Sequence, residues 1–169
     1  KGNIDLLKSL SNIYEFKVSV MEQIINKQNS MAYSSSFIRK NIKDGNFEDV
    51  NLMLGRNWIM DGKVIHGNKK ASKMNFPTAN ILPQHLIKPK KGVYAIRAKL
   101  INSFYDGIAN FGVRPTIDGE KLLLEAHIFE FNQEIYGKDL TVEFLTFIRE
   151  EKKFDDFSSL TEQIQKDIQ

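Results

Sequence analysis

The chain has 169 residues, of which 41% are hydrophobic and 27% charged, so it fits one domain of ordinary size or one domain with a short appendage. No apolar run approaches the ~18 residues of a transmembrane helix, and the absence of cysteine excludes disulfides, a thiolate nucleophile and a cysteine-based zinc site. The net charge of +3 is too small to favour nucleic acid, because lysine and arginine are interleaved with acidic residues throughout. We therefore expect a cytoplasmic protein without a membrane or nucleic-acid partner.

The first part of the sequence, up to Gly55, mixes helical and strand patterns. Residues 4–10 have the spacing of an amphipathic helix, and residues 16–20 alternate between apolar and polar, which predicts a strand. The serines at 34–36 can begin a helix that ends at Gly45, and a second short helix is expected to end at Gly55. This part is therefore predicted to be a small α/β segment.

After Gly55 the hydrophobic period changes to two, which is typical of β-strands. Strands are predicted at residues 58–65, 78–82, 93–101, 105–111, 122–131 and 140–148. The first is expected to be interrupted at Asp61-Gly62, a pair that favours turns. Apolar residues three and four apart predict a closing helix over residues 157–168. Several strands separated by Gly, Pro and Asn turns favour an antiparallel barrel or sandwich.

A polar, basic loop at residues 67–77 leads into a strand that begins with Thr78-Ala79-Asn80. At strand spacing, the side chains of Thr78 and Asn80 point to the same side. A hydroxyl and an amide carbonyl are hard oxygen donors that suit Mg²⁺, whose other ligands are commonly waters and substrate phosphates. From spacing alone, the alternative that both side chains bond the backbone at a turn is favoured.

The lysines of residues 67–73 could attract a phosphate group, although a solvated surface is favoured for such a cluster taken alone. A P-loop is excluded at this place. Gly62 and Gly67 have the required spacing, but Asn68 stands where the lysine of that motif must be. Any phosphate site here must therefore be of another kind.

Glu125 lies within an apolar strand, where an unpaired carboxylate is costly. It could act as a general base that takes the proton of an alcohol during phosphoryl transfer. The equally weighted alternative is that this face of the strand looks at solvent. Arg149, directly after the last strand, could contact a phosphate, stack on a ring or cap the end of the strand. The histidines lack the spacing of a metal site.

Eight segments of the sequence resemble the riboflavin kinases, in the order found in that family. The most distinctive is Phe76-Pro77-Thr78-Ala79-Asn80, which is similar to the family's Pro-Thr-Ala-Asn signature. The others lie at residues 54–56, 62–67, 92–95, 107–116, 124–127, 136–138 and 147–154. The resemblance covers about residues 54–169, which are predicted to be a riboflavin kinase domain.

This resemblance implies a mainly β fold, a six-stranded antiparallel Greek-key β-barrel with a C-terminal helix. It implies that Thr78 and Asn80 bind Mg²⁺ and that Glu125 is the catalytic base. The loop over residues 67–73 would fold over the phosphates of ATP, and the region after Arg149 would lie on the riboflavin side. The predicted binding residues are Gly67, Lys69, Ser72, Lys73, Asn110 and Arg149.

Residues 1–53 resemble the tail of the FMN adenylyltransferase domain that precedes the kinase in bacterial bifunctional FAD synthetases. The resemblance lies in residues 2–7, in residues 35–39 and in Asp44-Gly45. No histidine occurs before His66, so the motif that grips the α-phosphate near the start of that domain is absent. FAD synthesis from FMN and ATP is therefore expected only in a longer parent protein.

The sequence departs from the family at Ala71 and Asn75, where glycine is usual, and at Phe37, where threonine is usual. Asparagine adopts left-handed conformations less freely than glycine, so a phosphate loop that is stiffer or differently shaped is expected. The expected function is transfer of the γ-phosphate of ATP to the 5′-hydroxyl of riboflavin, which gives FMN and ADP. A non-catalytic flavin- or nucleotide-binding β-barrel is the alternative.

Overall fold

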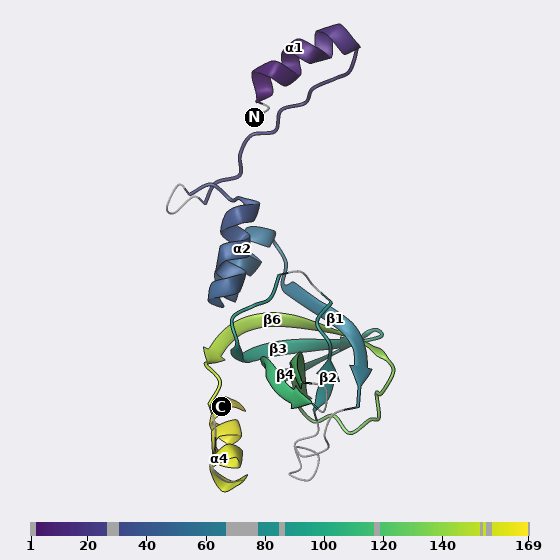
Figure 1. The fold of residues 1–169 in the computed structure, drawn as a ribbon, viewed down its shortest axis with the longest axis vertical. Coiled ribbons are helices and arrows are strands. Elements are labelled where there is room, and N and C mark those ends of the chain that lie inside the picture. Colours follow the sequence, from purple (N-terminus) through teal and green to yellow (C-terminus); the bar gives the residue numbers. More distant parts are fainter. Residues whose placement is uncertain are drawn as a thin grey trace. The chain divides into compact units, whose positions relative to one another are not determined.

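The computed structural model describes residues 3–26, 31–66, 78–84, 87–116, 119–152, 154 and 157–168. The chain divides into two compact units, Lys1–Ser34 and Ser35–Gln169, each of which makes its contacts mainly within itself. Figure 1 shows the helices and strands of both units in chain order. All the predicted site residues belong to the second unit.

The first unit contains one helix and an irregular segment. α1 spans Ile4–Tyr14, and the side chain of Asn3 caps it by accepting a backbone hydrogen bond of 2.8 Å from the first turn. The predicted strand over residues 16–20 is wrong, because this segment has no regular structure. Among the described residues of this unit, only an isolated bridge joins Ile25 to Ala32. An alternating pattern forms a strand only when a neighbouring strand supplies hydrogen bonds and a face to pack on.

Two short helices begin the second unit. α2 spans Ser35–Asp44 and α3 spans Phe47–Leu54. Gly45 follows α2 with a φ of 85°, and Gly55 follows α3 with a φ of 66°. In this left-handed conformation glycine lets the chain leave a helix without the steric penalty of a side chain. The predictions for both helices and for their ends are confirmed.

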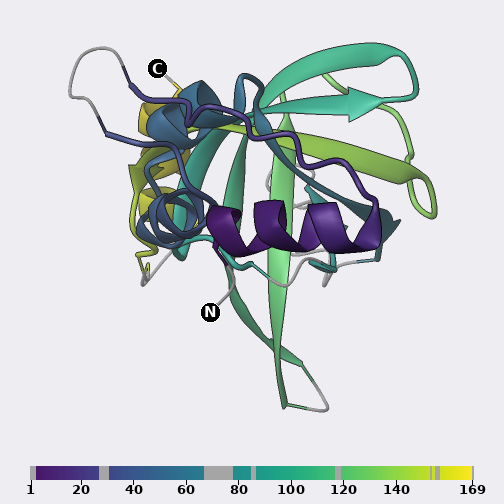
Figure 2. The same cartoon turned by 90° about the horizontal axis from the view of Figure 1, so that it is seen from above.

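Six strands then form a closed barrel (Figure 1). They are β1 (Trp58–Ile65), β2 (Ala79–Ile81), β3 (Gly92–Leu100), β4 (Ser103–Thr116), β5 (Gly119–Ile128) and β6 (Asp139–Arg149). All neighbours are antiparallel, in the order β1-β2-β5-β4-β3-β6, and β6 closes onto β1. The predicted six-stranded Greek-key barrel is confirmed, and the sandwich is not. Figure 2 shows β4 and β5 as a long hairpin that reaches out past the barrel.

β1 runs without a break through Asp61-Gly62, so the predicted interruption is wrong. Gly62 pairs in register with Leu140 of β6. A Cβ added to Gly62 would lie only 2.7 Å from Cγ2 of Ile81 on the neighbouring β2. Glycine at this position therefore allows the close approach of a core side chain and does not make a turn.

Apolar side chains of alternate strand residues fill the interior of the barrel, and α3 adds Phe47 to this core. The ring of Phe47 lies 5.4 Å from that of Trp58, 5.3 Å from that of Tyr94 and 5.0 Å from that of Phe144. We call these four residues the aromatic cluster. It joins α3 to β1, β3 and β6, which explains why the two short helices stay packed on the barrel.

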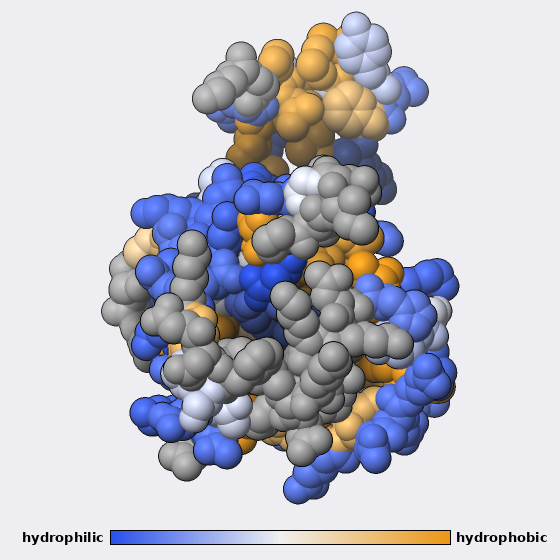
Figure 3. Space-filling view, turned by 60° about the horizontal axis from the view of Figure 1, so that its bottom comes forward, coloured by the Kyte–Doolittle hydropathy of each residue, from blue (hydrophilic) through white to orange (hydrophobic). Residues whose placement is uncertain are grey.

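The last helix, α4, spans Phe157–Ile168 and confirms the predicted closing helix. Across the described part of the chain, no helix is both long enough and apolar enough to cross a membrane. Figure 3 shows hydrophobic side chains gathered on the part of the molecule that contains α1, whereas polar side chains predominate over much of the described barrel surface in that view. The exposed apolar residues of α1 include Ile4, Leu7 and Ile13.

Candidate active site

Three predicted site residues lie side by side on neighbouring strands. Asn80 on β2 is the register partner of Glu125 on β5, and Glu125 is also the register partner of Asn110 on β4. Directly opposite residues of antiparallel strands carry their side chains on the same face, with Cβ atoms ~4.5–5.5 Å apart. Because Leu124 and Ala126 are fully buried in the barrel, the row Asn80–Glu125–Asn110 faces outward.

Thr78 directly precedes β2 and lies two residues from Asn80. The amide nitrogen of Asn80 donates to the backbone oxygen of Thr78 at 3.5 Å, which leaves the amide oxygen for another partner. Asn80 is buried, at 5% exposure, and its strand places it beside the carboxylate of Glu125. A hydroxyl and an amide oxygen are hard donors, so Thr78 and Asn80 fit Mg²⁺.

Glu125 is paired with Arg114 of β4. Nε and Nη2 of Arg114 both lie 2.6 Å from the same carboxylate oxygen, Oε2. Nη1 of this guanidinium lies 2.9 Å from Oε1 of Glu151, in the segment after β6. We call Arg114, Glu125 and Glu151 the arginine network. An ion pair thus compensates the partly buried carboxylate that the sequence places in an apolar strand.

Arg114 is held in its charged form. Burial acts to lower the pKa of Arg114, but hydrogen bonds and charge from Glu125, and then from Glu151, outweigh burial and raise this pKa above its ordinary value. The guanidinium therefore carries its full positive charge at any pH at which the folded protein would be assayed.

Asn110 connects the row to the arginine network. Its Nδ2 donates to Oε1 of Glu151 at 3.2 Å. Its Oδ1 is buried and has no hydrogen-bond partner among the residues that the structure describes. Buried polar atoms are normally paired, so an amide oxygen in this state beside Glu125 is suited to accept a hydrogen bond from a ligand.

Arg149, at the end of β6, is bonded to α4. Its Nε and Nη2 lie 2.8 and 2.6 Å from the carboxylate oxygens of Asp167. The side chain of Arg149 is 15% exposed and that of Asp167 is 3% exposed. Its Nη1 donates to the backbone oxygen of Glu150 at 3.1 Å. Arg149 therefore anchors the last helix to the barrel, and a direct contact between Arg149 and a substrate stays a prediction.

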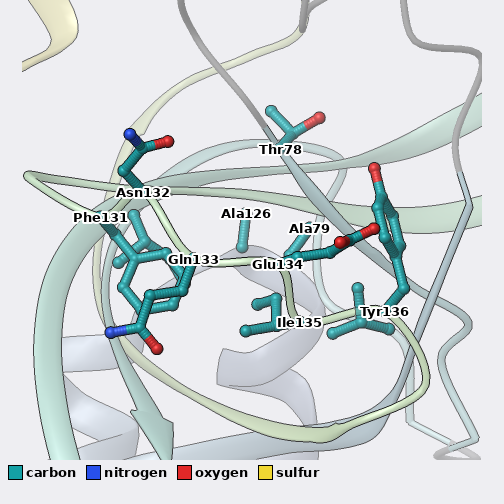
Figure 4. Close-up of a pocket in the computed structure, with 11 residues that line it drawn as sticks. Thr78, Ala79, Ala126, Phe131, Asn132, Gln133, Glu134, Ile135 and Tyr136 are labelled. Carbon is teal, nitrogen blue, oxygen red and sulfur yellow. The ribbon is translucent and has the colours of Figure 1, made fainter.

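A pocket with a volume of about 100 Å³ lies next to Thr78. Its apolar lining comes from Val64, Ala79, Ala126, Ile128 and Ile135. Figure 4 shows Phe131 and Asn132 on one side of the pocket and Tyr136 on the other. The ring of Tyr136 is stacked on that of His66, with centroids 4.0 Å apart. Thr78, Asn132, Gln133 and Glu134 make the rest of the lining polar. Because the buried Ala79 and Ala126 line the pocket, it lies on the side of β2 and β5 opposite to the row.

The predicted phosphate-binding residues Gly67, Lys69, Ser72 and Lys73 lie outside the described residues, as do Ala71 and Asn75. Their roles stay predictions. The ends of the strands that flank this loop are hydrogen-bonded neighbours, since Ile65 of β1 pairs with Asn80 of β2. The ends of β1 and β2 that the loop connects therefore lie beside the row.

Sequence reasoning did not identify Arg114 or Glu151. They are 37 residues apart, and no short motif joins them. Gly112 was the available signal: a Cβ added there would lie 2.0 Å from Oε1 of Glu151. A glycine inside a strand can mark a close approach, and here the approaching group is a carboxylate.

Comparison with known proteins identifies the family of the barrel. The family model Flavokinase, described as riboflavin kinase, matches residues 54–169. The bifunctional riboflavin kinase/FMN adenylyltransferase of Haemophilus influenzae is 38% identical over 170 residues, which cover 100% of this chain and 54% of the relative. The protein of the same name from Bacillus subtilis is 41% identical over 140 residues, which cover 80% of this chain and 44% of the relative.

One solved structure has a similar fold over almost the whole chain. The crystal structure of a macrolide-efflux protein from Streptococcus pneumoniae matches with a TM-score of 0.84 and 32% identity, over 95% of this chain and 53% of that chain. The chain spans about half the length of the curated relatives it matches. Together with the barrel and the row of site residues, the family match over more than half of the sequence shows that this chain belongs to the riboflavin kinase family.

Proposed function

We propose that the chain transfers the γ-phosphate of ATP to the 5′-hydroxyl of riboflavin, giving FMN and ADP. The observation that carries this proposal is the row Asn80–Glu125–Asn110, which sets a carboxylate between two amides. Membership of the riboflavin kinase family supports the reaction, and the names of the relatives support riboflavin as the acceptor.

In this reaction Glu125 takes the proton of the 5′-hydroxyl as its oxygen attacks the γ-phosphorus and the bond from that phosphorus to ADP breaks. Oε1 of Glu125 is the oxygen proposed to accept the proton, because Arg114 holds Oε2. Oδ1 of Asn110, which has no partner in the described part of the chain, is proposed to accept a hydrogen bond from a second hydroxyl of the ribityl chain.

Thr78 and Asn80 are proposed to hold the Mg²⁺ that accompanies ATP, and when bound this cation neutralises charge on the phosphate oxygens. The loop residues proposed to surround the phosphates are Gly67, Lys69, Ser72 and Lys73. Arg149 is proposed to act on the flavin side.

The role of Glu125 is tested by Glu125→Gln, which keeps the size of the side chain and removes its basicity. Loss of a general base lowers kcat by roughly 10²–10⁴, so we expect at least ~10² less FMN per unit time from riboflavin and MgATP. Binding of both substrates is expected to persist. Glu120→Gln is the matched control, since Glu120 is an exposed carboxylate on the same strand.

Near-normal kcat in Glu125→Gln would remove Glu125 from the role of base. If the unaltered chain binds riboflavin and MgADP but forms no FMN, the non-catalytic binding barrel is the correct function. If it binds neither ligand, both proposals are wrong.

The proposed metal site is tested by Asn80→Ala. Removing the amide oxygen should weaken MgADP binding, while ADP binding in the presence of a chelator should change little. Calorimetric titration with and without Mg²⁺ measures both affinities, and Asn102→Ala, in the exposed turn between β3 and β4, is the control. Unchanged MgADP affinity in Asn80→Ala would contradict the assignment.

We also propose that residues 1–53 are the tail of an FMN adenylyltransferase domain and that the parent protein works in the cytoplasm. Relatives named for both activities match the chain over its whole length, and the apolar side chains exposed on α1 are of the kind that a larger domain covers. The isolated chain should form no FAD from FMN and ATP, and formation of FAD would contradict this division of labour.

A further inference from the structure

We propose that Arg114 is a positioning residue for Glu125 and that Glu151 fixes Arg114, so that the segment after β6 sets the place of the catalytic carboxylate. The proposal rests on the proposed function, in which Glu125 is the base. It assigns roles to two charged side chains that the expected mechanism does not use.

The contacts of Arg114 with Glu125 are one-sided. Two nitrogens of the guanidinium, Nε and Nη2, converge on Oε2 at 2.6 Å each. In the described part of the chain, Oε1 of Glu125 has no comparable contact. A planar guanidinium that holds one oxygen in this way fixes the rotation of the carboxylate and leaves the other oxygen for a proton in transit.

Arg114 is itself held from its other side. Its Nη1 lies 2.9 Å from Oε1 of Glu151 and donates to the backbone oxygen of Val113 at 3.1 Å. The guanidinium therefore has partners in three directions, and the long arginine side chain is confined to one position. Without Glu151, Arg114 would keep its pair with Glu125 but would lose the contact that sets its orientation.

Glu151 is seated on the backbone of β4 as well. A Cβ added to Gly112 would lie 2.0 Å from Oε1, 2.4 Å from Cδ and 2.6 Å from Oε2 of Glu151, so the carboxylate lies flat against the glycine. Nδ2 of Asn110 adds a hydrogen bond of 3.2 Å to Oε1. Three contacts from β4, made by Asn110, Gly112 and Arg114, thus fix a carboxylate that belongs to the segment after β6.

The chain of contacts runs from Gly112 and Asn110 through Glu151 and Arg114 to Glu125. Misplacement of a reacting group by about 1 Å can lower a rate by roughly 10²-fold, so fixing this carboxylate matters more for kcat than for substrate binding. Gly112→Ala offers a sharp way to test the contact, because it leaves every charge unchanged and pushes Glu151 away. Gly112 is not in the left-handed conformation, so the backbone tolerates alanine.

The experiment measures kcat and the KM for riboflavin and for MgATP in Arg114→Met, Arg114→Lys, Glu151→Gln and Gly112→Ala. The control is Arg97→Met, which breaks an ion pair with Asp106 that lies on β3 and β4 but is well exposed. We expect kcat to fall roughly 10- to 100-fold in Arg114→Met, with each KM within about threefold of the unaltered chain. Smaller losses of kcat are expected in Arg114→Lys, Glu151→Gln and Gly112→Ala, and none in Arg97→Met.

Chemical rescue separates positioning from a merely structural role. Guanidinium ion at concentrations that do not unfold the protein should restore part of the kcat of Arg114→Met and should leave Glu125→Gln unaffected. A purely structural arginine would show a lowered unfolding midpoint and no rescue. Gly112→Ala keeps the test valid if Arg114→Met does not fold.

Three results would overturn the proposal. One is a kcat within twofold of the unaltered chain in both Arg114→Met and Gly112→Ala, while Glu125→Gln is inactive; the proposed function would then stand without the positioning role. The second is a loss of kcat/KM in these variants that comes entirely from a raised KM, with kcat unchanged. The third is full activity in Glu125→Gln, which would remove the base and the positioning role together.

Discussion

The aromatic cluster and the arginine network both join elements that are distant in sequence, but the first consists of aromatic side chains and the second of charged ones. Phe47, Tyr94 and Phe144 are at most 1% exposed, and the cluster contains no charge. The side chains of the arginine network are 27–30% exposed and all three are ionisable. The first region is mostly buried, whereas the second is partly exposed to solvent.

This difference separates stability from chemistry. Full burial of one large apolar side chain stabilises a fold by roughly 1.5–3 kcal/mol, whereas a partly exposed ion pair contributes roughly 0–1 kcal/mol. We infer that the aromatic cluster holds the barrel together and that the arginine network holds a geometry. Substitutions in the two regions should therefore fail in different ways.

The largest effect is expected at the aromatic cluster. Phe47→Ala should lower the free energy of unfolding by roughly 3–5 kcal/mol, because it removes a buried ring that touches three others and leaves a cavity. Denaturant unfolding measures the change. Leu52→Ala is the control, since Leu52 is on the same helix and is 61% exposed. Equal losses in both variants would show that α3 is not anchored by Phe47.

The pair of Arg149 and Asp167 tests whether burial or charge determines the contribution to stability, because it is a buried ion pair. Asp167→Ala should destabilise the protein by about 3 kcal/mol, since it leaves a mostly buried guanidinium without its partner. Hydrogen exchange should show faster exchange in α4. Asp139→Ala removes an ion pair that is 80% exposed on the aspartate side and should have little effect. If only Asp139→Ala lowered the free energy of unfolding, burial would not determine how much an ion pair contributes to stability.

The smallest effect is expected for the exposed pair of Arg97 and Asp106, whose side chains are 45% and 68% exposed. Asp106→Asn should change the free energy of unfolding by less than about 0.5 kcal/mol and should leave kcat unchanged. Thermal unfolding and the FMN assay measure the two quantities. A clear loss of kcat would mean that turnover depends on any charge near β4 and not specifically on the arginine network.

The sequence was sufficient for most of the barrel, because inward and outward residues alternate along the strands and the period of two is visible. It was insufficient for residues 16–20, where an alternating segment has no neighbouring strand to pair with. It was also insufficient at Gly62, because a glycine can mark either a turn or the close approach of another side chain. Both errors come from interactions with distant parts of the chain, which a local pattern does not contain.

The candidate site divides in the same way. The resemblance to riboflavin kinases named Thr78, Asn80 and Glu125, and strand pairing explains why Asn80 and Glu125 are neighbours. Their adjacency depends on the register of β2 on β5, which no local spacing specifies. Arg114 and Glu151 were missed because their roles depend on contacts between β4 and the segment after β6.

The short segment at the end of β6 has two attachments. Arg149 grips α4, and two residues later Glu151 rests on β4. A mechanical load on α4, such as that of a bulky fusion or a surface tether, would therefore reach Glu151 through Arg149, which is only two residues away. We expect such a load to lower turnover before it opens the barrel, so α4 is a suitable place to attach a force or strain reporter.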